Sequence, residues 1–148
     1  MMRRCEPVSG LQIPVLECGE PLVDLREQQA LRADDEVCVR LSLVDRLVTA
    51  QTLLPARVKL LVCQGYRATD PAHAAGAAVD LGLCTIDGEP VEARHDWGEM
   101  VRALQMVGLV NHPTESRHWS YGDLYWAHKT GAATARFGPF TCHRPGRA

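Results

Sequence analysis

The amino-acid sequence predicts an α+β domain in which a small antiparallel sheet has flanking helices. Three observations lead to this class: apolar strand-like segments are well separated, two stretches show helical apolar spacing, and short polar turns lie between them. The 148 residues suit one domain over 1–148 that can bury its own core. Residues 1–12 are expected to form an irregular N-terminal segment.

The first half of the chain contains one predicted helix between two predicted strands. Residues 21–25 (PLVDL) alternate like a short strand, and a polar loop follows them. Leucines and valines recur at helical spacing over 41–53, and Pro55 ends that helix. The run VKLLVC at 58–63 is typical of a buried strand.

The second half continues with strands on both sides of a second helix. Residues 77–84 (AAVDLGLC) predict another buried strand, and the Asp-Gly pair at 87–88 is a turn signal after it. A helix is expected over 97–107, with Gly108 as its stop. Two short strands are predicted at 118–121 and 124–128.

Charge and composition exclude several kinds of partner. The chain has 16 basic and 18 acidic residues, so nothing in its balance attracts nucleic acid or an anionic membrane. No apolar run approaches the roughly 20 residues of a membrane span, and no secretory signal opens the chain. We therefore expect a cytoplasmic protein without nucleic-acid or membrane partners, while its oligomeric state stays open.

The six cysteines are scattered and form no CxxC pair. A cytoplasmic chain with a real core does not need disulfides, so all six are interpreted as free thiols. Cys63 and Cys84 fall at the ends of the two central predicted strands. We expect both of these side chains to be buried.

Residues that could take part in chemistry lie in two segments, 73–80 and 115–118. Asp80 stands inside an apolar strand, where a carboxylate is costly unless it is paired, hydrogen-bonded or bound to a metal. Zinc hydrolysis needs three protein ligands, an open position and a carboxylate that does not bind the metal. His73, Asp80 and His118 would supply the ligands, and Glu115 would be the base.

Each segment also has an ordinary structural interpretation. Asp80 could cap a neighbouring loop, and His73 could be a solvated loop histidine. Glu115 could form a surface ion pair with Arg117, and His118 could pack against an aromatic side chain. The other histidines, including two near these segments at 112 and 128, show no ligand-like spacing and are interpreted as ordinary or rim groups.

At these motifs the sequence resembles the zinc D-alanyl-D-alanine dipeptidases of the vancomycin-resistance type. These enzymes belong to the D,D-carboxypeptidase and hedgehog-like metallopeptidase group. HAAGAAVD (73–80) fits the family pattern HxxGxAxD, and ESRHWSYGD (115–123) fits its second motif. Gly65-Tyr66-Arg67 matches the family's GYR. The resemblance extends roughly over residues 13–140 and implies a hedgehog/D,D-peptidase-like fold.

The resemblance also implies a division of roles within the site. One zinc ion per chain would be held by His73, Asp80 and His118, although cobalt, nickel or copper would suit the same donors. Glu115 would deprotonate the attacking water and protonate the leaving amine, while Arg67 would stabilise the oxyanion. The implied reaction is hydrolysis of a dipeptide or another small amide, with D-Ala-D-Ala as the family's substrate.

The chain departs from the family around this core. Only residues 68–72 separate GYR from the first histidine, where family members insert several tens of residues. Ser116 and Arg117 stand where two tryptophans are common, so these residues and Tyr66 are candidates for contacting substrate. Two alternatives follow: a repurposed biosynthetic metalloenzyme acting on a different small molecule, or a metal-binding protein without turnover.

Overall fold

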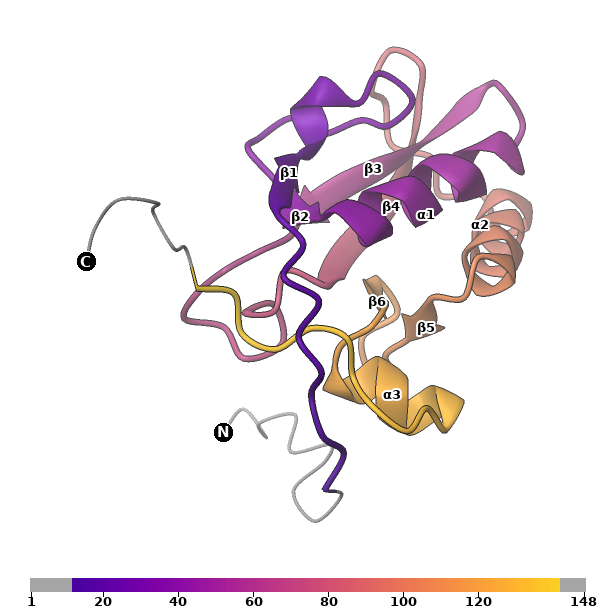
Figure 1. Ribbon diagram of the computed structural model, residues 1–148. Helices are drawn as coiled ribbons and strands as arrows, with labels where there is room; N and C mark the ends of the chain where they lie inside the picture. The colour runs from indigo at the N-terminus through magenta and orange to yellow at the C-terminus, as the bar shows by residue number, and fades with distance from the viewer. Residues whose placement is uncertain (1–11, 142–148) are drawn as a thin grey trace.

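A four-stranded antiparallel sheet forms the centre of the fold in the computed structural model, which describes residues 12–141 (Figure 1). The strands are β3 (Val58–Gln64), β4 (Ala78–Thr85), β5 (Val110–Asn111) and β6 (His118–Ser120), in the order β3-β4-β6-β5. The predicted strands at 58–63 and 77–84 match β3 and β4 to within one residue at each end. The α+β class is confirmed.

A second, two-stranded antiparallel sheet lies beside the first. It pairs β1 (Leu22–Asp24) with β2 (Cys38–Arg40), and a 3₁₀ helix, η1 (Leu25–Glu27), follows β1 directly. The strand at β1 was predicted from its alternation. β2 was not predicted.

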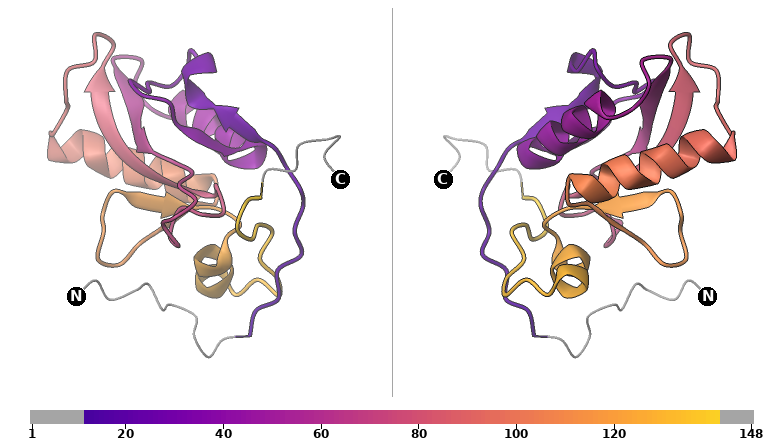
Figure 2. Two further views of the ribbon diagram at one scale, coloured as in Figure 1. Left: turned by 90° about the vertical axis from the view of Figure 1, so that its left-hand side faces the viewer. Right: turned by 90° about the vertical axis from the view of Figure 1, so that its right-hand side faces the viewer.

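Helices α1 (Leu41–Thr52) and α2 (Arg94–Met106) pack against each other and against the core face of the large sheet (Figures 1 and 2). Both were predicted. α2 begins three residues earlier than expected, because its first turn is polar and carries no apolar signal. Their buried side chains include Leu43, Val44, Leu47, Ala50, Met100, Ala103 and Leu104.

The segment predicted as a strand at 124–128 is instead a helix, α3 (Leu124–Thr130). Its two ends explain the correction. The Asp123 carboxylate accepts the backbone N–H of Trp126 at 2.8 Å, which caps the first turn. Gly131 ends the helix with a left-handed φ of 71°. These local bonds outweigh the strand preference of the aromatic residues between them.

The cysteines among residues 12–141 are all free thiols, as predicted, but only one of the two expected to be buried is buried. Cys84 is fully buried, whereas Cys63 is exposed. The pairing of β3 with β4 shifts between Val62 and Gln64, so a bulge at Cys63 interrupts the alternation. Cys5 and Cys142, like nearly all of the predicted irregular segment 1–12, lie outside the described residues.

The two ends of the described chain run along the same side of the molecule (Figure 2). The backbone N–H of Leu16 donates to Ala135, and that of Cys18 donates to Arg136. The buried Arg40 side chain joins both segments, because it donates to Glu17 at 2.9 Å and to the Gly138 carbonyl at 3.1 Å. No helix within residues 12–141 is long and apolar enough to cross a membrane.

Candidate metal centre

Three of the predicted site residues converge where the two central strands of the large sheet meet the segment before β4. Nε2 of His73 lies 3.5 Å from Oδ1 of Asp80, and Nδ1 of His118 lies 3.4 Å from the same oxygen. The three ligand atoms all lie within 4.8 Å of one another. A single ion placed among them would be within reach of all three.

Strand pairing determines two of these positions. Asp80 of β4 lies directly opposite His118 of β6, and opposite residues on antiparallel strands point to the same face. Gln64 of β3 pairs with Asp80 from the other side. The three residues therefore form one row across the sheet. His73 approaches this row from the turn-rich segment that precedes β4.

The His73 ring is oriented by its second nitrogen. Nδ1 lies 3.3 Å from the Ala78 carbonyl oxygen, which can only accept, so Nδ1 carries the proton in this contact. Nε2 is left facing Asp80. A backbone carbonyl that fixes the far nitrogen in this way is a common support for metal-ligating histidines.

The donor set fits a zinc-type ion on two counts. Two imidazoles and one carboxylate are ligands that zinc accepts, and three ligands leave a position open. In addition, Nδ1 of His118 is buried and has no hydrogen-bond partner with good geometry among residues 12–141. A buried nitrogen left without a partner is costly, and a bound cation would satisfy it.

The charges of the cluster favour an ionised carboxylate. Contacts with His118 and then His73 hold the pKa of Asp80 well below its usual range. Burial opposes ionisation of His73, but the bonds and charge of Asp80 outweigh it, so the pKa of His73 is raised. Without a metal, the cluster therefore favours a proton on His73.

A cavity of about 430 Å³ opens beside the cluster. Glu115, Ser116 and Arg117 line it together with two of the potential metal ligands, Asp80 and His118. Glu115 is exposed on the turn between β5 and β6, and its carbonyl oxygen accepts the backbone N–H of His118 at 2.9 Å. The lining residues are Cys63, Gln64, Asp80, Thr114, Glu115, Ser116, Arg117 and His118.

Arg117 does not pair with Glu115. Its guanidinium carbon lies 5.7 Å from the centre of the Trp97 ring, and no ion pair joins the two residues in the described part of the chain. The surface ion pair considered from the sequence is therefore not formed.

Arg67 and Tyr66 lie outside the cavity lining. Arg67 is exposed, and its Nη1 donates to Oε1 of Gln64 at 3.2 Å, so it touches the cavity wall only through that amide. The Tyr66 hydroxyl donates to the Phe140 carbonyl at 3.4 Å, and the two rings meet edge to face. Tyr66 therefore secures the C-terminal segment in this structure.

Two further residues adjoin the site: His112, which the sequence placed among the ordinary or rim histidines, and Gln64, which was not predicted as a site residue. The His112 ring lies 5.6 Å from the His118 ring, and burial followed by the His118 charge lowers the pKa of His112. Gln64 reaches the site because it pairs with Asp80. This pairing is known only once β3 and β4 have been aligned. His128 is exposed on α3.

A second group of potential ligands lies on the small sheet, where Asp24, Glu36 and Cys38 come within 4.8 Å. The Asp24 carboxylate is already engaged, because Arg26 donates to both of its oxygens. A cation would have to displace that guanidinium. This group is consequently a weaker candidate than the cluster around Asp80.

No protein-family model matches the chain, and no curated protein matches it significantly. The relationship to the D,D-dipeptidases therefore stays a prediction from the two motifs.

Proposed function

We propose that the protein is a metal-dependent hydrolase of a small peptide or amide, with one zinc ion held by His73, Asp80 and His118. One observation carries the proposal: the three ligand atoms lie within 4.8 Å of one another beside a cavity that Glu115 also lines. A purely structural metal site has no need of an additional carboxylate at an open cavity.

The residues at the cavity would have separate roles in amide hydrolysis. Bound at the cluster, zinc would supply Lewis-acid chemistry that polarises a carbonyl and acidifies water. Glu115 would take the proton of the attacking water and pass it to the leaving amine. His73 and His118 would share the single oxygen of Asp80 as their common neighbour, which keeps all three donors in place.

The cavity favours a small polar substrate. Its volume of about 430 Å³ is sufficient for a dipeptide, so D-Ala-D-Ala is the first substrate to test. Arg117 is the arginine that lines the cavity, and its guanidinium suits a substrate carboxylate or a developing oxyanion. Arg67 would reach the same place only after leaving Gln64.

A second candidate function follows from the positions of these two arginines. With Arg117 and Ser116 at the cavity and Arg67 outside its lining, the groups presented to substrate differ from those that the family resemblance implies. This favours a metalloenzyme that acts on a different small molecule. A cytoplasmic location is part of both proposals.

The test is release of free D-alanine from D-Ala-D-Ala by zinc-reconstituted protein. Glu115→Gln should lower turnover by at least about a hundredfold, because it removes the proton acceptor. Bound zinc should stay at one per chain. His118→Ala should lose both zinc and turnover, and the exposed Glu92→Gln should change neither.

The outcomes separate the alternatives. Failure of the folded protein to bind zinc stoichiometrically would exclude every version of the proposal. Zinc binding without D-alanine release would favour the second candidate and direct the search to other small molecules. Zinc-dependent release that survives in Glu115→Gln would remove Glu115 from its assigned role.

A further inference from the structure

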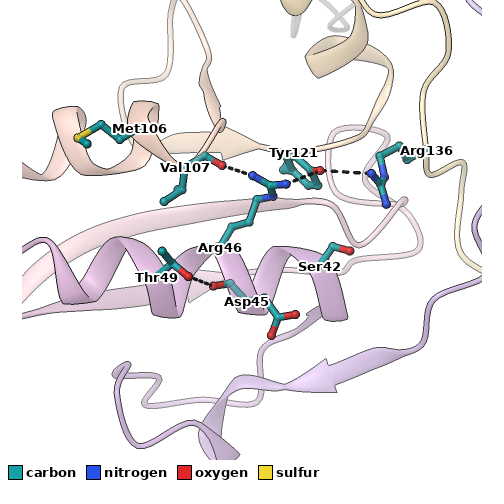
Figure 3. A pocket seen from close by; sticks show the side chains of 8 residues that line it. All are labelled: Ser42, Asp45, Arg46, Thr49, Met106, Val107, Tyr121 and Arg136. Atoms are coloured by element: carbon teal, nitrogen blue, oxygen red, sulfur yellow. Dashed lines mark hydrogen bonds between the residues drawn. The ribbon is translucent and has the colours of Figure 1, made fainter.

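A second cavity, of about 480 Å³, lies among α1, the end of α2, the residue after β6 and the C-terminal segment (Figure 3). Its wall is mostly polar. The lining residues are Ser42, Asp45, Arg46, Thr49, Met106, Val107, Tyr121 and Arg136. None of them belongs to the metal cluster or its cavity.

Two arginines meet at one neutral oxygen in this cavity. Nη2 of Arg46 donates to the Tyr121 hydroxyl oxygen at 2.9 Å, and Nη1 of Arg136 donates to the same oxygen at 3.4 Å. Arg46 also donates to the Val107 carbonyl at 2.6 Å. Two guanidinium charges therefore lie close together with only neutral acceptors.

No carboxylate compensates these charges. Neither Arg46 nor Arg136 forms an ion pair with any residue from 12 to 141. Asp45 lines the cavity, but Figure 3 shows its carboxylate pointing away from both guanidinium groups. Paired arginines without a counter-charge are an arrangement that an anion would stabilise.

Arg136 carries a further unmet donor. Its Nε is buried and has no hydrogen-bond partner among the described residues. Its guanidinium also lies 5.7 Å from the ring centre of Tyr121 and 5.9 Å from that of Phe137, so the side chain is held in place by aromatic contacts. Arg136 is therefore a positioned cation at the cavity wall.

We propose that this cavity binds a phosphate group between Arg46 and Arg136, either as free phosphate or as part of a small molecule. A doubly charged tetrahedral anion matches two guanidinium groups better than a single carboxylate does. The Tyr121 hydroxyl accepts from both arginines, which leaves its own proton free to be donated to a phosphate oxygen. Ser42 also lines the wall, but its hydroxyl already donates to the Glu20 carboxylate and is not counted as a donor to phosphate.

The site is separate from the metal centre. Tyr121 contacts Arg46 of α1, which covers the core face of the large sheet. Successive strand residues point to opposite faces, so Asp80 lies on the other face from its core neighbours Val79 and Leu81. The phosphate group is therefore not assigned to the proposed hydrolysis.

The test is a titration with inorganic phosphate at constant ionic strength, followed by NMR of the arginine Nε–H signals. We expect saturable shifts of the Arg46 and Arg136 signals. The Arg57 signal is the internal control, because Arg57 is paired with Asp96 on another part of the surface. Ring signals of His73 and His118 report separately on any phosphate at the metal centre.

Two variants of one arginine make the test specific. Arg136→Gln should weaken phosphate binding by at least about tenfold, since a charged hydrogen-bond partner is lost. Arg136→Lys keeps the charge and should retain part of the affinity. Asp45→Asn removes a nearby negative charge and should strengthen binding, an effect that a merely structural role for the arginines does not produce.

A comparison of two ligands shows whether the cavity binds free phosphate or a phosphorylated small molecule. Glycerol 3-phosphate that binds more tightly than inorganic phosphate assigns the cavity to a phosphorylated small molecule, and equal or weaker binding assigns it to free phosphate. The proposal is overturned if millimolar phosphate produces no saturable shift at Arg46 and Arg136. It is equally overturned if both Arg136 variants, shown by their spectra to be folded, bind phosphate as the wild type does.

Discussion

At the scale of single residues, Asp80 organises the candidate site. Both histidines approach the same carboxylate oxygen, at 3.5 and 3.4 Å. The sequence identified Asp80 because an acidic side chain inside an apolar strand needs a partner. His73 and His118 followed from motif spacing, and the structure places both beside it.

The protonation of His73 predicts how metal affinity depends on pH. Because Asp80 raises the pKa of His73, a proton competes with the metal up to a higher pH than for an ordinary histidine. Zinc affinity should be highest above that pKa and fall by about tenfold per pH unit below it. Chelator competition from pH 8 to pH 5 would measure the slope, and a flat profile would contradict it.

The arginines of the site could not be distinguished from the sequence. Arg67 and Arg117 both adjoin the motifs, and their residue type alone does not say which one lines the cavity. The answer depends on side-chain contacts: Gln64 holds Arg67, whereas Arg117 extends over Trp97. Such contacts exist only after the strands and loops have been assembled.

At the scale of elements, length explains only part of what could be predicted. α1, α2, β3 and β4 are long enough to repeat their apolar pattern and were found. β1 and β6 were also predicted although each has three residues, whereas β2 and β5, with three and two residues, were missed. α3 was taken for a strand because its aromatic residues favour strands, whereas its caps at Asp123 and Gly131 favour a helix.

The loop that carries His73 depends on one glycine. Gly76 has a φ of +66°, and a Cβ there would lie 2.5 Å from Cδ2 of Leu22. Gly76→Ala should cost about 1–2 kcal/mol for the left-handed backbone, with the clash in addition. Because the N–H of Gly76 donates to the His73 carbonyl, zinc affinity should fall as well.

Gly131→Ala is the matched control for this substitution. Gly131 has a φ of +71° and open space around its Cβ position, so the variant has the same backbone strain without the clash. Urea denaturation would give the free energy of unfolding of both variants, and the difference between their losses of stability would measure the cost of the clash. Equal losses of stability, together with unchanged zinc affinity in Gly76→Ala, would contradict this account.

At the scale of the whole molecule, Arg40 joins three segments that are distant in sequence. Its buried guanidinium donates to Glu17, to the Ala75 carbonyl and to the Gly138 carbonyl. The Phe140 N–H donates to Ala74 and adds a second tie between the C-terminal segment and the loop of His73. The two ends of the described chain thereby support the loop that carries His73.

Removing this junction should destabilise the fold. Arg40→Met leaves buried carbonyl groups without their donor, and we expect a loss of about 2 kcal/mol or more in the free energy of unfolding. Urea denaturation measures it. Arg26→Met, which removes an exposed arginine paired with Asp24, should have a much smaller effect. Equal effects would show that Arg40 is not a junction.

The placement of Glu115 has a consequence for how such a protein can change over evolutionary time. The three proposed metal ligands lie on the sheet and its adjoining loop, while Glu115, Ser116 and Arg117 share one exposed hairpin turn. Substitutions or insertions in that turn could alter the reaction or its substrate while the ligand set stayed intact. New activities would therefore arise most readily by exchange of this turn, with the metal site inherited unchanged.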